Sequence, residues 1–369
     1  MSETFICSHC GDRFDIEERN YFDGSELCED CYDEEVVSCE HCGTRMWADD
    51  VADSDSDMVL CEDCFQDYYC CCSDCGITIH NDNAYYIDDD EDYPYCCNCY
   101  EQHCSHEFIH SYSYKPDPIF YGDGNRYFGV ELEIDVGGQD DSNAETLAEI
   151  ANADGVKHIY IKRDGSLSDG MEIVTHPMSL EYHLNEMPWK DTMHKAVRMG
   201  YLSHKTSTCG LHIHVNKTAF GSNHEEQDEC ISRVLFFVER FWQELLKFSR
   251  RTEVQMTRWA ARYGIKENPK ATLDNAKKNY SGRYTCVNLT NYHTIEFRIF
   301  RGTLKYSTLV ATLQLVNKIC DIAISMSDED ITVLNWCDFV SSIEEPELIN
   351  YLKERRLYVN EPVECEEEV

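Results

Sequence analysis

Two histidines on one predicted strand are the first residues that could do chemistry. His212 and His214 lie in the segment CGLHIHV. Side chains alternate between the two faces of a strand, so both imidazoles point to one side and the apolar residues between them to the other. Such a pair is as typical of a structural contact or a stray metal site as of catalysis. It gains meaning because other segments carry similar polar faces.

Carboxylates follow the same alternation in two upstream segments. YFGVELEID places Glu131 and Glu133 on one face of a strand, and GMEIVTHP places Glu172 between two apolar residues. Two carboxylates on a strand face are usually solvated surface. Glu172, however, lies in an apolar strand that ends before Pro177, which predicts a half-buried site.

Two downstream segments add guanidinium groups. RYTCVNLT places Arg283 and Asn288 near the ends of a short strand. HTIEFRIFRGTL places Glu296 and Arg298 on one face, whereas Arg301 at the strand end faces the opposite way. The sequence therefore predicts strands that present acidic, imidazole and guanidinium groups together.

The elements that must position these groups alternate between strands and amphipathic helices. Strands are expected around residues 127–135, 157–162, 170–176, 209–215, 283–290 and 293–304, with a turn at 164–166. Helices are expected at 143–153, 180–199 with an interruption at Pro188, 230–251, 306–326, 331–341 and 346–356, from apolar residues at helical spacing. The pattern favours an α+β domain.

Positive charge gathers in one part of this acidic chain. Between Lys247 and Lys305 there are 13 Lys/Arg against 4 Asp/Glu, although the formal net charge of the chain is −38. The middle of this region, GIKENPKATLDNAKKNYSGRY, is polar and rich in turn residues. It predicts a mobile loop that meets an anion such as a nucleoside triphosphate, with a solvated loop as the alternative.

Cysteine pairs repeat through residues 7–99 with a period of about 32–33 residues. Each of three units has a C-x2-C-G pair followed by a second C-x2-C pair. Four thiolates per unit match tetrahedral structural zinc, and the glycine permits the tight turn that aims two sulfurs at one ion. The ligand sets are Cys7, Cys10, Cys28 and Cys31; Cys39, Cys42, Cys61 and Cys64; and Cys72, Cys75, Cys96 and Cys99. These units resemble treble-clef and LIM-like modules.

Several metal-binding side chains remain outside these sets. They are Cys70, Cys71, Cys97, His103, Cys104 and His106. Three interpretations stay open: these residues form a fourth metal site, they replace some of the cysteines that bind the third ion, or they bind no metal. The interleaved Cys/His order of RING-type ubiquitin ligases is absent, because each unit closes on itself.

Charge and cysteine content limit the partners and the compartment. Residues 1–120 hold 31 Asp/Glu against 4 Lys/Arg, so this third would repel nucleic acid and suits a protein partner. Sixteen of the 22 cysteines precede residue 105, and the N-terminus MSETFICSHC has no signal-peptide pattern. No apolar run reaches the roughly 18 residues of a membrane span. We therefore expect a cytoplasmic protein with reduced thiols and without membrane or nucleic-acid partners.

These observations divide the 369 residues into four parts. Residues 1–104 form three tandem four-cysteine zinc modules, and residues 105–125, which carry Pro and Gly without periodicity, form a linker. Residues 126–345 are expected to form the domain that carries the candidate site residues, and residues 346–369 a C-terminal helix and an acidic tail. The sequence says nothing about the oligomeric state.

Five blocks, in order, carry a family resemblance. FGVELEI, KRDGSL…GMEIVTHP, TCGLHIHV, RYTCVNL and TIEFRIFRGTL resemble the amidoligase family, in the group of glutamine synthetase and glutamate–cysteine ligase-like carboxylate–amine ligases. The resemblance covers about residues 126–320 and excludes the zinc modules. It implies an antiparallel sheet with helices on one face, whose other, concave face holds ATP and divalent cations. It also suggests a bacterial or bacteriophage origin.

The resemblance implies a role for each polar residue. Glu131, Glu133, Glu172, His212 and Glu296 would bind Mg2+ or Mn2+, which prefer carboxylate oxygens. His214 would contact the phosphates or a metal, and Arg283, Arg298 and Arg301 would hold the phosphates or the substrate carboxylate. Asp164 lies at a turn beside the site with Lys162 and Arg163, and either Asp164 or Glu131 could deprotonate the amine.

Three functions compete. The first is an ATP-dependent, amide-bond-forming ligase that acts through an acyl phosphate, with zinc modules that recruit a protein or peptide substrate. The second is a phosphotransferase of the guanidino-kinase type. The third is a zinc-module adaptor with an inactive ligase domain, which the presence of every expected polar block counts against. The carboxylate and amine substrates are not readable, and a free amino acid is the alternative to a protein.

Overall fold

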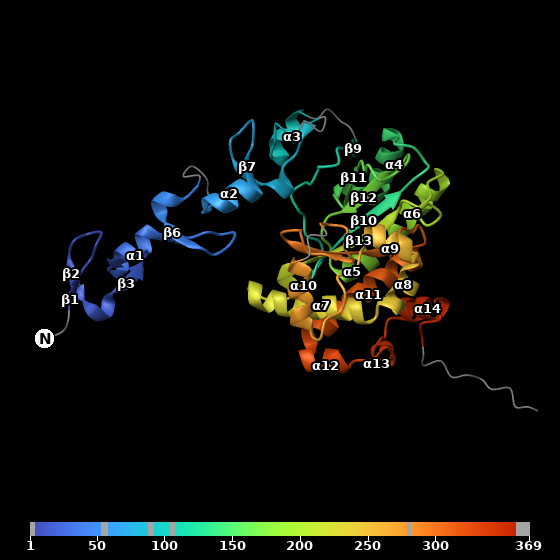
Figure 1. Cartoon of the computed structure of the whole chain (residues 1–369). Helices are drawn as coiled ribbons and strands as arrows, with labels where there is room; N and C mark the ends of the chain where they lie inside the picture. The colour runs from blue at the N-terminus through green and yellow to red at the C-terminus, as the bar shows by residue number, and fades with distance from the viewer. Residues whose placement is uncertain (1–3, 53–57, 88–91, 104–107, 279–281, 359–369) are drawn as a thin grey trace, which may run out of the picture. The chain divides into compact units, whose positions relative to one another are not determined.

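The computed structural model describes residues 4–52, 58–87, 92–103, 108–278 and 282–358. It divides into two compact units (Figure 1). Unit 1 comprises Met1–Ser105 with Ser113–Pro116, and unit 2 comprises His106–Tyr112 with Asp117–Val369. The predicted acidic tail lies outside the described residues, as do Cys104 and His106 of the suggested fourth metal site.

Unit 1 repeats one small motif, a β-hairpin followed by a 3-10 turn and a short helix. Its strands are β1 (Thr4–Ile6), β2 (Arg13–Asp15), β3 (Asn20–Phe22), β4 (Ser25–Leu27), β5 (Val36–Ser38), β6 (Arg45–Trp47), β7 (Tyr69–Cys71) and β8 (Thr78–His80). Its 3-10 turns are η1 (Ile16–Glu18), η2 (Ala48–Asp50) and η3 (Asn81–Asn83), and its helices are α1 (Glu29–Glu35), α2 (Glu62–Tyr68) and α3 (Cys97–His103). Helix α1 passes directly into β5, and α2 into β7, so no linker separates the repeats.

Each repeat gathers four cysteines, and the three predicted four-cysteine clusters are confirmed. The first pair lies in the turn of the hairpin and the second at the start of the helix, where Cys28 is the N-cap of α1 and Cys31 lies in its first turn. Gly11, Gly43 and Gly76 adopt φ of +79°, +76° and +75°, the left-handed region that the tight turn requires. The prediction of a glycine-dependent turn is therefore confirmed.

Backbone N–H groups point at the sulfurs of these clusters. The N–H of Cys96 donates to Cys72 Sγ at 3.2 Å. Burial opposes ionisation of the Cys72 thiol, but N–H donors from Cys75, Cys96 and Asp74 lower its pKa to about 6. Thiolates of this kind are zinc ligands, so the clusters are compatible with the predicted zinc.

Neighbouring repeats touch through one equivalent position. Trp47, the last residue of β6, packs edge-on against Phe22 of the preceding repeat with ring centroids 5.0 Å apart. His80, the last residue of β8, stacks on His41 and Tyr68 of the repeat before it, at 6.0 and 6.4 Å. In both cases, the last residue of the second hairpin strand packs against the preceding repeat.

Unit 2 is built on a seven-stranded sheet in the order β14-β15-β13-β10-β12-β11-β9. The strands are β9 (Ile109–His110), β10 (Phe128–Ile134), β11 (Ile159–Lys162), β12 (Met171–Thr175), β13 (Gly210–Asn216), β14 (Val287–Asn288) and β15 (Thr294–Arg301). All pairs are antiparallel except β9 with β11, which is parallel. The expectation of a purely antiparallel sheet is wrong at that edge, because part of the predicted linker adds a strand there.

The helices of unit 2 bury the apolar face of the sheet. They are α4 (Asp141–Ala151), α5 (Leu180–Asn185), α6 (Trp189–Arg198), α7 (His224–Arg240), α8 (Trp242–Ser249), α9 (Glu253–Trp259), α10 (Pro269–Lys278), α11 (Tyr306–Ser325), α12 (Asp328–Val333), α13 (Trp336–Ser341) and α14 (Pro346–Glu354), with 3-10 turns at Ala153–Gly155 and Lys217–Ala219. Val130, Leu132, Leu211 and Ile213 join the helices in one core. This confirms the α+β prediction, whereas the glutamine-synthetase-like fold stays a prediction.

Helix α11 lies at the centre of that core. The expectation that no apolar run reaches the length of a membrane span is wrong for this helix, which is long and apolar enough to cross a membrane by length and composition. Of the apolar stretch that meets this criterion, 72% is buried inside the protein. Thr308, Leu313, Ile319 and Ala323 are among its buried residues. Its apolar character is therefore explained by packing within unit 2.

Three predicted boundaries differ from the structure. The expected 230–251 helix is two helices, α7 and α8, because Phe241 leaves helical geometry at φ −99°, ψ 33°. The expected 331–341 helix is likewise divided into α12 and α13. The expected polar loop contains α10, because Asn268 caps its N-terminus and Leu273 and Ala276 are buried. Asn-Pro at 268–269 was the missed start signal.

Candidate active site

Neighbouring strands bring the predicted polar residues together on the sheet face opposite the apolar core. Strand β13 lies between β10 and β15, so Glu131 is opposite His212 and His214 is opposite Glu296. Strand β12 borders β10 on its other side, which places Glu172 opposite Glu133. Four strands therefore supply one polar cluster, and the register alone assembles it.

His212 is the centre of this acidic cluster, which comprises Glu131, Glu133, Glu172 and Glu296. Its Nδ1 atom lies 3.2 Å from Glu131 Oε2 and 3.5 Å from Glu296 Oε1. Its Nε2 atom lies 3.8 Å from Glu133 Oε1. The ring thus has carboxylates on both nitrogen sides. His214 Nε2 lies 3.3 Å from the second oxygen of Glu131.

The cluster offers two sets of ligand atoms that share His212. One set is Glu131, His212 and Glu296, and the other is Glu133, Glu172 and His212. The ligand atoms of each set lie within 4.8 Å of one another. Carboxylate oxygens with one imidazole nitrogen suit Mg2+ or Mn2+. His214 borders the first set, because its Nε2 atom lies beside Glu131.

Basic side chains surround the acidic cluster. Lys162 Nζ lies 3.2 Å from Glu172 Oε2, and Arg298 donates to Glu296, which also accepts from Asn288 Nδ2 at 2.8 Å. Arg251 was not predicted from the sequence. A Cβ on Gly210 would lie 2.6 Å from Arg251 Nη2 and 2.6 Å from His212 Nε2, so this guanidinium reaches the cluster.

The cluster is almost closed off from solvent. Glu133, Glu172 and Glu296 are 4%, 2% and 3% exposed. Burial raises carboxylate pKa values, but the charges of His214, His212 and Lys162 hold the pKa of Glu131 well below its usual range. Burial and the neighbouring carboxylates Glu131 and Glu133 raise the pKa of Glu172 despite Lys162. The cluster is therefore short of positive charge at Glu172, where a divalent cation would supply it.

Two tyrosines connect the basic groups at the rim. The Lys162 ammonium lies 5.5 Å from the ring centroid of Tyr112, and the Arg283 guanidinium lies 5.4 Å from the same ring. Arg283 and Arg298 lie 5.1 and 5.7 Å from the ring of Tyr284. Arg283 itself is exposed. These cation–π contacts extend from Lys162 to Arg298 along the edge of the acidic cluster.

Two predicted residues lie apart from the cluster in the described structure. Asp164 accepts from the Ser166 N–H at 2.6 Å in its turn and acts on Glu133 and Glu172 only through its charge. Arg301 donates to the carbonyl oxygens of Thr206 and Arg250 instead. The alternation of side chains had placed Arg301 on the other face of the strand from Glu296 and Arg298, which agrees with its distance from the cluster.

Local structure explains why the sequence places the cluster here. The pairing of β13 with β15 shifts register between Leu211 and Ile213, so an extra residue of β15 lies opposite His212. The N–H of Gly210 donates to Glu133. Asp135, the next acidic residue on this face, instead accepts from the N–H groups of Ser168 and Asp169 at 3.1 and 2.7 Å. It anchors the loop before β12 and is not part of the cluster.

Sequence reasoning missed Arg251, Tyr112 and Tyr284. Arg251 comes two residues after the last residue of α8, and only the local excess of cations pointed to this region. Tyr112 lies in the predicted linker, where nothing in the pattern marked it. The positions of Arg251 and Tyr112 depend on contacts between segments that are far apart in the sequence, which periodicity does not reveal.

Comparison with known proteins gives one family and a set of structural relatives. Residues 139–320 match the model of the family described as "Putative amidoligase enzyme", a segment that includes His212, Glu296 and Arg298 and begins after β10. No curated protein matches the chain. Among solved structures, 11 chains are similar.

One of these is a bifunctional glutathione synthetase from Pasteurella multocida, with 13% identity and a TM-score of 0.39. The alignment covers 63% of this chain and 46% of that protein, so the chain spans less than half of its length. Residues 139–320 of the chain are therefore similar to the amidoligase family.

Proposed function

We propose that this protein is an ATP-dependent carboxylate–amine ligase that forms an amide or isopeptide bond through an acyl phosphate. The observation that carries the proposal is the pair of ligand sets that share His212, beside Arg298 and Lys162. The match of residues 139–320 to the amidoligase family model supports it.

The acidic cluster would hold two Mg2+ or Mn2+ ions, one at each ligand set. When bound, these cations offset the repulsion between the triphosphate of ATP and the substrate carboxylate. Arg298 and His214 lie at the same face and would contact phosphate oxygens. Arg283 at the rim is placed to meet an anionic group that enters from solvent.

Burial strengthens the electrostatic interactions of the charged groups in the acidic cluster. Charges act more strongly in a closed site because water does not screen them. Glu131 stays ionised beside two histidines, so it is available as a metal ligand, and its lowered pKa makes it a weak acceptor for a proton from the attacking amine. The ion pair between Lys162 and Glu172 keeps the Lys162 ammonium group inside the acidic cluster before substrate binds.

The four-cysteine modules form a separate part of the proposal. We infer that they bind three structural zinc ions and recruit a protein or peptide substrate, because four thiolates per site leave no open position for catalysis. Unit 1 is strongly acidic, which suits a basic partner. A cytoplasmic setting, where thiols stay reduced, belongs to the same proposal.

A product search tests the activity. Purified protein is supplied with Mg-ATP, an amino-acid pool and a cell lysate, and the release of ADP and phosphate is followed. Mass spectrometry then searches for products lighter than the sum of two reactants by one water. We expect ADP and a condensed product, both lost in the double variant Glu131→Ala/Glu133→Ala.

A matched variant controls for the loss of two charges. Glu145 and Glu149 are exposed residues of α4, so Glu145→Ala/Glu149→Ala should turn over ATP at the normal rate. A phosphorylated product without an amide would instead favour the phosphotransferase function. Unchanged turnover in the Glu131/Glu133 variant would show that this face is ordinary surface.

A further inference from the structure

Five side chains of unit 2 form a row of alternating cations and rings beside the acidic cluster. We call them the basic row: Lys162, Tyr112, Arg283, Tyr284 and Arg298. Along the row, each charged group lies over a neighbouring ring, at 5.5, 5.4, 5.1 and 5.7 Å from the ring centroid. Arg283 also donates hydrogen bonds to the hydroxyl groups of Tyr112 and Tyr284. The row is therefore continuous from one end to the other.

The sheet shows where the two ends of the basic row lie. Lys162 comes from β11 and Arg298 from β15, and strands β12, β10 and β13 lie between these two. The three middle strands carry three of the four carboxylates of the acidic cluster. Both ends reach the same face of the sheet, since Lys162 pairs with Glu172 and Arg298 with Glu296. A row that links both ends therefore spans the acidic cluster from one side to the other.

The middle of the basic row is also the part of the site that meets solvent. The carboxylates that the row borders are nearly buried, with Glu172 2% and Glu296 3% exposed. By contrast, Tyr112 and Tyr284 are 40% and 39% exposed, and Arg283 is exposed as well. An ion or a substrate that enters the acidic cluster from this side must pass these three side chains.

The contact between Tyr112 and Arg283 joins two segments that are far apart in the sequence. Tyr112 follows β9, whereas Arg283 and Tyr284 precede β14. Tyr284 has support of its own, because its ring packs edge-on against Trp259 at 5.8 Å. Loss of the Tyr112–Arg283 contact would therefore divide the row at its middle and leave each half attached to its own strand. Cation–π contacts at exposed positions are weak, so this one can open and close.

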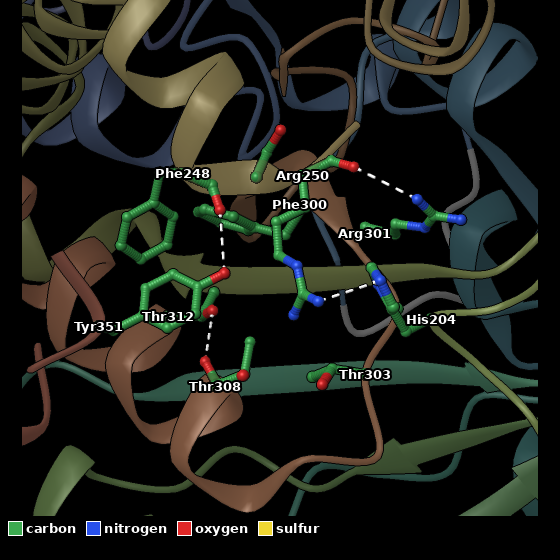
Figure 2. A pocket seen from close by; sticks show the side chains of 11 residues that line it. His204, Phe248, Arg250, Phe300, Arg301, Thr303, Thr308, Thr312 and Tyr351 are labelled. Atoms are coloured by element: carbon green, nitrogen blue, oxygen red, sulfur yellow. Dashed lines mark hydrogen bonds between the residues drawn. The ribbon is translucent and has the colours of Figure 1, made fainter. Parts of the chain in front are cut away.

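Other cations near the acidic cluster are held elsewhere. Arg250 Nη2 lies 3.0 Å from His204 Nε2, and Arg301 donates to the carbonyl oxygen of Arg250 at 3.4 Å (Figure 2). These contacts keep both guanidinium groups beside the end of α8 and the end of β15. The span across the acidic cluster therefore depends on Arg283, the cation between the two tyrosine rings.

We propose that Tyr112 positions Arg283 across the acidic cluster, and that this pair controls the entry and release of what the cluster binds. Tyr112 is a positioning residue, because it acts through Arg283 and Lys162. An incoming anion offers Arg283 charge-assisted hydrogen bonds in place of its contacts with the tyrosines, so substrate entry and opening of the row are coupled. The proposal rests on the cation site proposed above but not on the ligase reaction.

Manganese exchange tests this role on the full-length, zinc-loaded protein. Binding of Mn2+ after rapid mixing, and its release into excess Mg2+, are followed by the electron paramagnetic resonance of free Mn2+. Tyr112→Leu should raise the association rate and the release rate together by about tenfold and change the affinity by less than about threefold, because one weak contact closes the row. A purely electrostatic or structural role would instead change the affinity.

Further variants guard against local unfolding in Tyr112→Leu. Arg283→Gln removes the cation but keeps Tyr112 on Lys162, so it should raise both rates by a similar factor. The double variant Tyr112→Leu/Arg283→Gln should be no faster than either single variant, because all three break the same contact. Tyr112→Phe keeps the ring and should lie closer to the wild type than Tyr112→Leu.

Two control variants match these changes. Tyr21→Leu removes another exposed tyrosine, whose ring centroid lies 5.0 Å from the Arg19 guanidinium in unit 1. Arg198→Gln removes an exposed cation of α6. Both should exchange Mn2+ at the wild-type rates. Unchanged rates in Tyr112→Leu, or additive effects in the double variant, would overturn the role of Tyr112 alone, whereas a wild-type protein that binds no Mn2+ would overturn the cation site together with it.

Discussion

The Nδ1 atom of His212 lies 3.2 Å from Glu131 Oε2, across the pairing of β10 with β13. Because the ring is shared by both ligand sets, His212→Gln should weaken Mn2+ binding at both, by about 10–100-fold. Electron paramagnetic resonance of free Mn2+ measures the affinity and the number of sites. His224→Gln, at an exposed histidine of α7, is the matched control and should bind Mn2+ normally. Two intact sites in His212→Gln would contradict this arrangement.

Gly210 provides a second test of the acidic cluster. A methyl group there would lie 2.6 Å from both Arg251 Nη2 and His212 Nε2, so both side chains must move. Gly210→Ala should lower Mn2+ affinity severalfold, with a loss of about 1 kcal/mol in the free energy of unfolding. Mn2+ titration and urea unfolding measure the two effects. Gly165→Ala, where a methyl group meets no atom within 4 Å, should change neither.

His183 should make the stability of unit 2 sensitive to acid. Its ring is fully buried, with Nε2 3.0 Å from the Phe128 carbonyl oxygen, and burial lowers its pKa to about 4. The unfolded chain binds a proton here near the ordinary value of about 6.5. Stability from this group is therefore full above that value and falls as the pH drops toward 4.

The expected loss from His183 between pH 7 and pH 5 is roughly 2 kcal/mol in the free energy of unfolding. Urea unfolding at both values measures it. His183→Gln keeps an N–H donor for Phe128 but does not titrate, so its pH dependence should be smaller by that amount. An identical pH dependence in both proteins would show that the ring is already protonated or accessible in the folded state.

Zinc removal should unfold unit 1 and leave unit 2 folded. Structural zinc contributes about 10–16 kcal/mol to small domains of this kind, whereas unit 2 has its own apolar core. Native mass spectrometry should find three zinc ions, and amide exchange after chelation should rise only in unit 1. Cys42→Ser should lose one ion, whereas Cys71→Ser, an exposed cysteine outside the clusters, should keep all three. Slow exchange in unit 1 without zinc would contradict the prediction.

Deletion of residues 1–105 tests recruitment by the modules. Unit 2 should keep ATP turnover with small substrates, and activity on the protein substrate should fall at least tenfold if the modules bind it. The cut must precede residue 109, because Ile109–His110 pair with β11 and Tyr112 contacts Lys162. Full activity on the protein substrate after deletion would remove the recruitment role. Kinetic assays with both substrate types measure the difference.

Periodicity predicted the parts of the fold that depend on local pattern. The alternation in β10, β13 and β15 indicated which face each of Glu131, His212 and Glu296 occupies, and the register brings them together. The four-cysteine clusters followed from spacing alone. A strand with one buried face must turn its apolar side chains to the core, and four cysteines around one ion must come close together. Few local structures meet either requirement, so the sequence pattern predicts them.

Contacts between distant segments could not be predicted in the same way. Arg251 reaches the acidic cluster only because α8 ends beside β15, and Ile109 joins the sheet through a parallel pair with Ile161. Neither depends on a local pattern. Helix α10 was missed because its polar composition outweighed the Asn268 cap and its two buried apolar residues.

The contacts of Trp47 and His80 make unit 1 a line of nearest neighbours. In such an array the stability of one repeat depends on those beside it. Among the described residues, the middle repeat contacts a repeat on each side, whereas the first repeat contacts the second. Opening of the middle repeat must break two interfaces, so its metal ion should exchange with solution more slowly than the first. The order in which the repeats release their metal ions would then measure how strongly the stability of one repeat depends on its neighbours.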